Sequence, residues 1–114
     1  MASCIFCGIA SGEIQSKIAH SDSMMVAFHD ANPQAPRHIL LIPRKHVSSL
    51  RELSADDEAV IGHIVRIAAQ LAEEQGIADG GFRLVANSGP DAGQSVDHVH
   101  FHLLGGRRMG WPPG

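Results

Sequence analysis

Several kinds of pattern are missing from this 114-residue sequence, and each absence argues against a class of protein. No apolar run approaches roughly 18 residues, the length that a membrane-spanning helix needs, and the N-terminus carries no signal-peptide pattern. The nine Lys and Arg residues are scattered, which argues against nucleic acid as the main partner. We therefore expect a soluble, cytoplasmic protein with no nucleic acid and no membrane as partner.

Cysteine is scarce as well, and the only two cysteines, Cys4 and Cys7, form a C-x-x-C pair. In a reducing compartment such a pair is more typical of metal binding or redox chemistry than of a structural disulfide. What the composition does provide is an apolar fraction of 44%, which is enough for a hydrophobic core. The sequence has no internal repeat or low-complexity segment, so we expect one domain over residues 1–114.

The spacing of apolar residues predicts a mixed α+β fold. It indicates a short helical turn over 4–11 that holds Ile5, Phe6 and Ile9 against the core. It also indicates a long helix over about 55–75, and strands over 17–20, 24–29, 38–42 and 82–87. Ser54 and Asp57 resemble a helix N-cap with its acidic N3 residue, and Gly76 is typical of a helix end. The apolar stripe of the long helix is wide. It indicates either a second contact surface, most simply with a symmetric partner, or a helix well buried in a monomer.

The strongest signal is a strict alternation of histidine and apolar residues from His98 to Leu104, which predicts a strand with one buried face. Val99, Phe101 and Leu103 should point into the core, and His98, His100 and His102 the opposite way. Neutral imidazole is a nucleophile, a base and a metal ligand near pH 7. The row of histidines is therefore a solvated face, a metal-binding ladder or a catalytic centre.

The loop over residues 88–95, just before the histidines, has the composition of an anion-binding turn. Gly93 allows backbone N–H groups to approach a ligand, Ser95 adds a hydroxyl, and Asn87 offers an amide at the end of the preceding strand. Alone, such a loop is usually only a turn. Beside the histidines it indicates a phosphate site. No acidic cluster suited to Mg²⁺ accompanies it, which favours attack by His on phosphorus and a covalent intermediate.

The chain resembles the histidine triad (HIT) superfamily of nucleotide hydrolases and transferases, and within it the Hint branch. Residues 98–104 match the family's H-φ-H-φ-H-φ-φ motif. Matching stretches elsewhere are His29-Asp30, 33–36, His38, 42–43, 45–46, Asn87, 92–95, 105–107 and the Trp-Pro-Pro-Gly ending over 111–114. The resemblance implies an α+β HIT-like fold: a five-stranded antiparallel sheet with one long helix and a short N-terminal helix, in a homodimer with joined sheets.

The resemblance also implies an activity and the residues that carry it. A nucleoside phosphoramidase of this type cleaves the P–N bond of adenosine or guanosine 5'-phosphoramidates and releases AMP or GMP. The implied catalytic residues are His100 as nucleophile, with His102 and Ser95. The implied nucleotide-binding residues are Ile5, Phe6, Ile9, Phe28, His29, Asp30, Ala31, Asn87, Gly93, Gln94, Ser95, His100 and His102. The resemblance also implies that His38 and His98 hold the catalytic residues in position. It implies that Trp111 of the partner subunit contributes to the site.

Cys4, Cys7, His46 and His98 have the residue types of a tetrahedral zinc site. The resemblance implies a structural zinc at these positions, with no cofactor required for catalysis. The alternative is a pair of reduced cysteines without metal.

Other interpretations stay open at this point. Asp30 either binds the ribose hydroxyls, as the resemblance implies, or only forms a turn. The protein is alternatively a dinucleoside polyphosphate hydrolase, which the short chain and its Trp-Pro-Pro-Gly ending disfavour. It is alternatively a nucleotide-binding regulatory protein whose hydrolysis is incidental.

Overall fold

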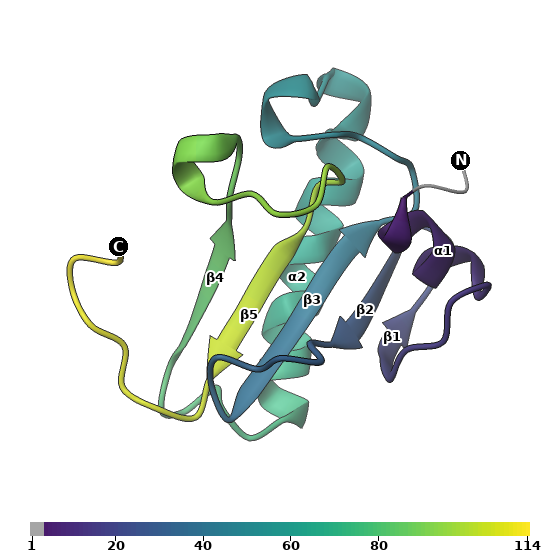
Figure 1. Ribbon diagram of the computed structural model, residues 1–114. Helices are drawn as coiled ribbons and strands as arrows, with labels where there is room; N and C mark the ends of the chain where they lie inside the picture. Colours follow the sequence, from purple (N-terminus) through teal and green to yellow (C-terminus); the bar gives the residue numbers. More distant parts are fainter. Residues whose placement is uncertain (1–3) are drawn as a thin grey trace.

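The computed structural model describes residues 4–114 and, within that range, contains two α-helices and five strands (Figure 1). The helices are α1 (Ile5–Ser11) and α2 (Glu58–Glu74), and the strands are β1 (Ile18–Ser21), β2 (Met25–His29), β3 (Arg37–Pro43), β4 (Phe82–Ala86) and β5 (Phe101–Gly105). Short 3₁₀ turns cover Leu50–Glu52, Ala55–Asp57 and Pro90–Ala92. Over residues 4–114 no helix is long and apolar enough to cross a membrane.

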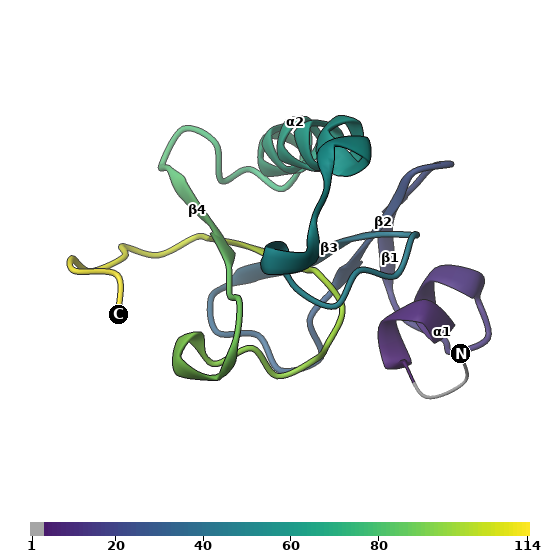
Figure 2. The same cartoon turned by 90° about the horizontal axis from the view of Figure 1, so that it is seen from above.

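The strands form one antiparallel sheet in the order β1-β2-β3-β5-β4. Strand β3 lies in the middle, and it is buried from His38 to Pro43 because α1 packs on one face of the sheet and α2 on the other (Figure 2). This arrangement confirms the expected α+β fold. It also explains why β3 reads as a continuous apolar run rather than an alternating one.

Side-chain alternation along β2 and β3 divides the core into two apolar layers. Toward α2 the sheet packs Met25, Ala27, Ile39, Leu41 and Leu103 against Ile64, Ile67, Ala68, Leu71 and Ala72. Toward α1 it packs Val26, Phe28, Leu40 and Ile42 against Phe6 and Ile9. Each fully buried large side chain contributes about 1.5–3 kcal/mol. The two layers hold the sheet rigid between the helices, which positions the polar residues that lie on the α1 side.

Three local predictions need correction. The strand expected from His98 begins only at Phe101, since Pro43 on the facing strand has no N–H and its carbonyl accepts a bond from the His98 side chain. The long helix begins with a 3₁₀ turn, and its α-helical part starts at Glu58. Ile5, expected to pack against the core, is 49% exposed.

Candidate functional site

The imidazole of His100 is held in one orientation. Its Nδ1 lies 2.7 Å from the backbone carbonyl oxygen of His98, so the Nδ1–H group donates to that oxygen. The ring of Phe6 on α1 meets it edge-on, with ring centroids 5.0 Å apart. Because a neutral imidazole carries only one proton, Nε2 of His100 keeps its lone pair. The side chain is buried, as is that of His98, so the interpretation of a solvated histidine face was wrong.

His102 lies beside His100 and is oriented from behind by His38. Residue His38 pairs with Leu104 and Leu40 pairs with His102, so the two histidines are diagonal neighbours on one face of the sheet. The backbone N–H of Gln34 donates to Nδ1 of His38 at 3.0 Å, which leaves the ring proton of neutral His38 on Nε2. That Nε2–H faces Nδ1 of His102 at 2.9 Å. His102 therefore carries its own proton on Nε2.

Burial keeps these rings neutral. It lowers the pKa of His102 to about 4, with further lowering by the nearby His100 and His38 and opposition from Asp30. Burial likewise lowers the pKa of His38, again against the influence of Asp30, whose Oδ2 lies 3.4 Å from Nε2 of His38. At neutral pH His38 and His102 are therefore neutral, and His102 presents its imidazole N–H beside Nε2 of His100.

A cavity of about 380 Å³ joins these histidines to the apolar pocket beneath α1. It is lined by the predicted residues Ile5, Phe6, Ile9, Phe28, His29, Asp30, Ala31, Ser95, His100 and His102. Asp30 stands at the end of β2, where its Oδ1 accepts the backbone N–H of Asn32 at 2.8 Å. Burial, with the nearby charges of Lys17 and Arg37, lowers the pKa of His29. We call this space the triad cavity; it has the size and mixed lining typical of a small-molecule site.

Three of the expected nucleotide-binding residues do not line the triad cavity, and neither does Trp111, which was expected to reach the cavity of the partner subunit. Asn87 follows β4, and Gly93 stands in the left-handed conformation that ends the 3₁₀ turn. The amide of Gln94 is engaged within the loop, accepting from Gly89 N–H and donating to the carbonyls of Ser48 and Val96. The side chain of Trp111 is 83% exposed in the C-terminal tail.

Other residues line the triad cavity although the sequence did not single them out: Ile14, Gln15, Ser16 and Leu40. Gly12 ends α1 with a φ of 85°, and the chain then turns back so that residues 14–16 come close to the pocket. No local motif marks this return. The side chain of Leu40 is identifiable only through its pairing with His102, which requires the strand register.

Cys4, Cys7, His46 and His98 are brought together at the start of α1, and we call them the Cys/His cluster. Their ligand atoms all lie within 4.8 Å of one another. Nδ1 of His98 lies 3.4 Å from Cys4 Sγ, 3.6 Å from Cys7 Sγ and 3.2 Å from Nδ1 of His46. Nε2–H of His98 donates to the carbonyl of Pro43 at 2.9 Å, so Nδ1 directs a lone pair into the cluster.

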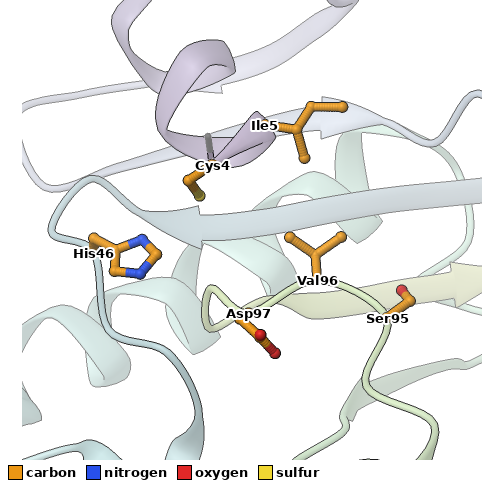
Figure 3. A pocket seen from close by; sticks show the side chains of 6 residues that line it. All are labelled: Cys4, Ile5, His46, Ser95, Val96 and Asp97. Carbon is orange, nitrogen blue, oxygen red and sulfur yellow. The ribbon is translucent and has the colours of Figure 1, made fainter. Parts of the chain in front are cut away.

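A hollow of about 440 Å³ lies between the Cys/His cluster and the loop before β5 (Figure 3). Cys4, His46 and Ser95 line it together with Asp97. Ser95 also lines the triad cavity, so this serine stands between the two spaces. The cluster therefore adjoins His100 and His102 without lining the triad cavity.

The chain is similar to known proteins over nearly all of its length. Residues 3–110 match the family described as scavenger mRNA decapping enzyme C-term binding. An uncharacterised HIT-like protein of Synechocystis is 46% identical over 110 residues, which are 96% of this chain and 96% of that protein. The purine nucleoside phosphoramidase of Escherichia coli K12 is 44% identical over 106 residues, which are 93% of this chain and 89% of that enzyme.

Solved structures agree with these sequence relatives. A HIT family hydrolase from Legionella pneumophila is 45% identical and superposes with a TM-score of 0.96, covering 98% of this chain and 100% of that one. A histidine triad protein from Clostridium difficile is 41% identical, with a TM-score of 0.93 and 96% of each chain covered. The similarity therefore extends from the sequence to the arrangement of the whole backbone.

Proposed function

Because the chain belongs to the histidine triad (HIT) family of hydrolases, we propose that it hydrolyses the P–N bond of adenosine and guanosine 5'-phosphoramidates. The observation that carries this proposal is the pair of oriented imidazoles in the triad cavity. His100 offers a lone pair, and His102 offers an N–H beside it. A nucleophile next to a hydrogen-bond donor is what displacement at a phosphate needs.

In the proposed reaction, Nε2 of His100 attacks the α-phosphorus of the nucleotide. A bond forms between that nitrogen and phosphorus, the P–N bond to the amine breaks, and the departing nitrogen takes a proton so that it leaves as a neutral amine. Water then attacks the same phosphorus, the proton it gives up replaces the one that the amine took, and the bond to His100 breaks. The products are AMP or GMP, and His100 returns to its neutral form.

The remaining polar groups act on the phosphate and the ribose. Nε2–H of His102 and the hydroxyl of Ser95 donate to the phosphoryl oxygens and assist proton transfer to the amine. Asn87 and the backbone of Gly93 and Gln94 are proposed as further phosphate contacts, although they lie next to the triad cavity beyond Ser95 and do not line it. The carboxylate of Asp30 accepts the ribose hydroxyls, which are two adjacent O–H donors. Losing one donor that acts mainly in the transition state costs about 10²-fold or more in rate.

The purine lies in the apolar part of the triad cavity. Phe6, Ile9 and Phe28 supply its buried walls, and Ile5 and Ala31 its rim. An apolar slot with few polar groups holds either purine, because it reads the shape of the base more than its exocyclic groups. Adenine and guanine nucleotides should therefore both be substrates.

We further propose that the Cys/His cluster holds a structural zinc ion. Tetrahedral zinc separates two nitrogen ligands by about 3.3 Å and a nitrogen from a sulfur by about 3.5 Å. The corresponding distances here are 3.2 Å for the two nitrogens, and 3.4 to 3.6 Å between nitrogen and sulfur. The hydrogen bond from His98 to Pro43 is the kind of outer contact that orients a metal-bound imidazole. Such an ion would anchor α1 beside His100 and supply no chemistry to the reaction. Cys4 and Cys7 form no disulfide, which suits a reducing compartment such as the cytoplasm.

The proposal includes a homodimer in which the two sheets join. Strand β4 ends the sheet, and Phe82 on it and Val65 on α2 leave apolar side chains 39% and 48% exposed. An unpaired edge strand beside exposed apolar side chains supports association with a second copy. The joined sheets would bring Trp111 of the partner subunit to the triad cavity. Light scattering should give the mass of two chains, and a stable monomer would contradict this part of the proposal.

Turnover of an AMP phosphoramidate of a fluorescent amine tests the proposed function, with diadenosine polyphosphates assayed in parallel. His100→Ala should reduce turnover by on the order of 10⁴-fold or more while AMP still binds. Gln70→Ala, on the exposed face of α2, serves as the control. Rapid quenching should capture a nucleotide bonded to His100. Faster cleavage of the polyphosphate would show that the substrate class is wrong, and binding of AMP without any turnover would identify a regulatory protein instead.

A further inference from the structure

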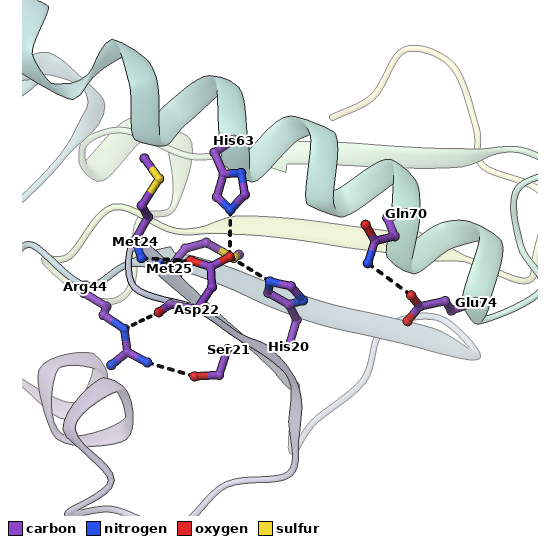
Figure 4. Close-up of polar contacts among 9 residues, drawn as sticks. All are labelled: His20, Ser21, Asp22, Met24, Met25, Arg44, His63, Gln70 and Glu74. Carbon is purple, nitrogen blue, oxygen red and sulfur yellow. Dashed lines mark hydrogen bonds and ion pairs between the residues drawn. The ribbon is translucent and has the colours of Figure 1, made fainter.

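Three side chains outside the triad cavity converge where helix α2 approaches the turn after β1 (Figure 4). His20 lies on β1, Asp22 lies in the turn between β1 and β2, and His63 lies on α2. Nε2 of His20 and Nε2 of His63 each stand 2.7 Å from Oδ2 of Asp22. A single carboxylate oxygen is thus shared by two imidazoles from distant parts of the chain. We call these residues the His/Asp cluster.

The carboxylate of Asp22 is fixed before any ligand arrives. Its other oxygen, Oδ1, accepts the backbone N–H groups of Met24 at 2.8 Å and Met25 at 3.0 Å. The guanidinium of Arg44 contacts the backbone carbonyl of Asp22 at 2.7 Å and the hydroxyl of Ser21, rather than the carboxylate (Figure 4). Oδ2 is therefore left to face the two imidazoles.

The same contacts keep Asp22 charged. Burial on its own would raise the pKa of this carboxyl group, but hydrogen bonds from His63, His20 and the two backbone N–H groups hold it well below its usual range. The cluster thus presents a permanent negative charge between two ring nitrogens. A cation that accepts nitrogen and oxygen ligands is the complementary partner.

We propose that His20, Asp22 and His63 form a binding site for a divalent transition-metal ion, separate from the Cys/His cluster. Their ligand atoms all lie within 4.8 Å of one another. Two imidazoles and one carboxylate suit Ni²⁺, Co²⁺, Zn²⁺ and similar ions, and hard ions such as Mg²⁺ much less.

The spacing needs only a small adjustment to admit such an ion. Ligands about 2.1 Å from an ion and at right angles to each other are about 3.0 Å apart. Each Nε2 would therefore move away from Oδ2 by about 0.3 Å, which a small rotation of the imidazole supplies. When the ion binds Nε2 of a neutral imidazole, the ring proton moves from Nε2 to Nδ1, so that metal binding releases no proton. The three side chains are 20% to 28% exposed, which leaves the outer side of the ion to water.

The competing interpretation is a purely hydrogen-bonded clamp between α2 and the β1–β2 turn. Both interpretations give the cluster a structural effect, because either would tie the helix to the sheet. Of the two interpretations, only the metal site makes the binding of a metal ion depend on His20 and His63. The proposal does not rely on the phosphoramidase activity.

Titration with Ni²⁺ of protein purified without a His-tag, followed by NMR, tests the site. The paramagnetic ion should broaden the assigned imidazole signals of His20 and His63, which a hydrogen-bonded clamp would leave sharp. His63→Gln should weaken Ni²⁺ binding at the cluster by more than about tenfold, since even outer contacts of a metal site are worth ~10–100-fold. His20→Gln should do the same, which covers a failure of the first variant to fold.

The matched control is Glu74→Gln, which removes a carboxylate of the same helix that pairs with Gln70 instead of the cluster (Figure 4). This variant should bind Ni²⁺ as the wild type does. Broadening confined to His46 and His98 would assign the ion to the Cys/His cluster and overturn the proposal. Equal affinity in wild type and His63→Gln would overturn it as well.

Discussion

The hydrogen-bond chain behind His102 makes a sharp prediction about His38. His38 accepts the Gln34 N–H through Nδ1 and donates to His102 through Nε2, so the two ends of one ring have separate tasks. An Asn side chain reaches the position of Nδ1, and a Gln side chain reaches that of Nε2. His38→Asn therefore keeps the bond with Gln34 and loses the donor to His102, whereas His38→Gln keeps that donor.

The expected cost follows from what His102 loses. The loss of one buried hydrogen bond that fixes the tautomer of the His102 ring costs up to about 1.5 kcal/mol. That corresponds to a roughly tenfold lower rate. If the proton then moves to Nδ1 of His102, the donor to the phosphate disappears entirely, and about 10²-fold is lost. We expect the reduction in kcat for His38→Asn to lie between these two limits. His38→Gln should recover most of the activity.

Steady-state turnover of an AMP phosphoramidate measures the loss, and calorimetry with AMP checks that binding survives. Nitrogen NMR of labelled imidazoles reports the tautomer of His102 directly: Nε2 protonated in the wild type, and a mixture in His38→Asn. Equal activity in the Asn and Gln variants would refute the reasoning. A wild-type His102 protonated on Nδ1 would refute it independently.

Three further predictions concern stability and metal content. Because burial holds the pKa of His102 at about 4 while the unfolded ring titrates near ~6.5, the unfolded state takes up the proton first as pH falls. The free energy of unfolding should therefore be constant above pH ~6.5 and should decrease toward pH ~4, with this residue contributing at most about 3 kcal/mol to the decrease. Urea titrations should show a smaller decrease for His102→Asn. Gly105→Ala should destabilise by about 1–3 kcal/mol, because the added methyl carbon would stand 2.6 Å from Ile77 Cδ1, whereas Gly110→Ala, with open space around it, should be near neutral. Cys7→Ser should lower the zinc content per chain measured by elemental analysis, and unchanged content would contradict zinc at the Cys/His cluster.

Short-range patterns predicted much of the fold. The apolar run from His38 to Ile42 identified the central strand, because a strand covered on both faces reads as a short continuous apolar run. The Ser54–Asp57 pair marked the start of the long helix, and the Asp57 carboxylate does accept the backbone N–H of Ser54 at 2.9 Å. The exact ends of the helices and of β5 were less predictable, since they depend on contacts with other elements, such as the bond between His98 and Pro43.

The sequence by itself determined which chemistry is available: three alternating imidazoles, a glycine- and serine-containing loop, and a C-x-x-C pair, together with the family to which these belong. Only the tertiary structure decided how those groups are arranged. Pairing of β3 with β5 brings His38 to His102 across 64 positions of sequence, and packing of α1 brings Cys4 to His98 across 94. The His/Asp cluster follows the same rule, because it forms only when α2 lies over the turn after β1. Distances, burial and tautomers arise from the packing of residues far apart in the chain, and no local pattern encodes them.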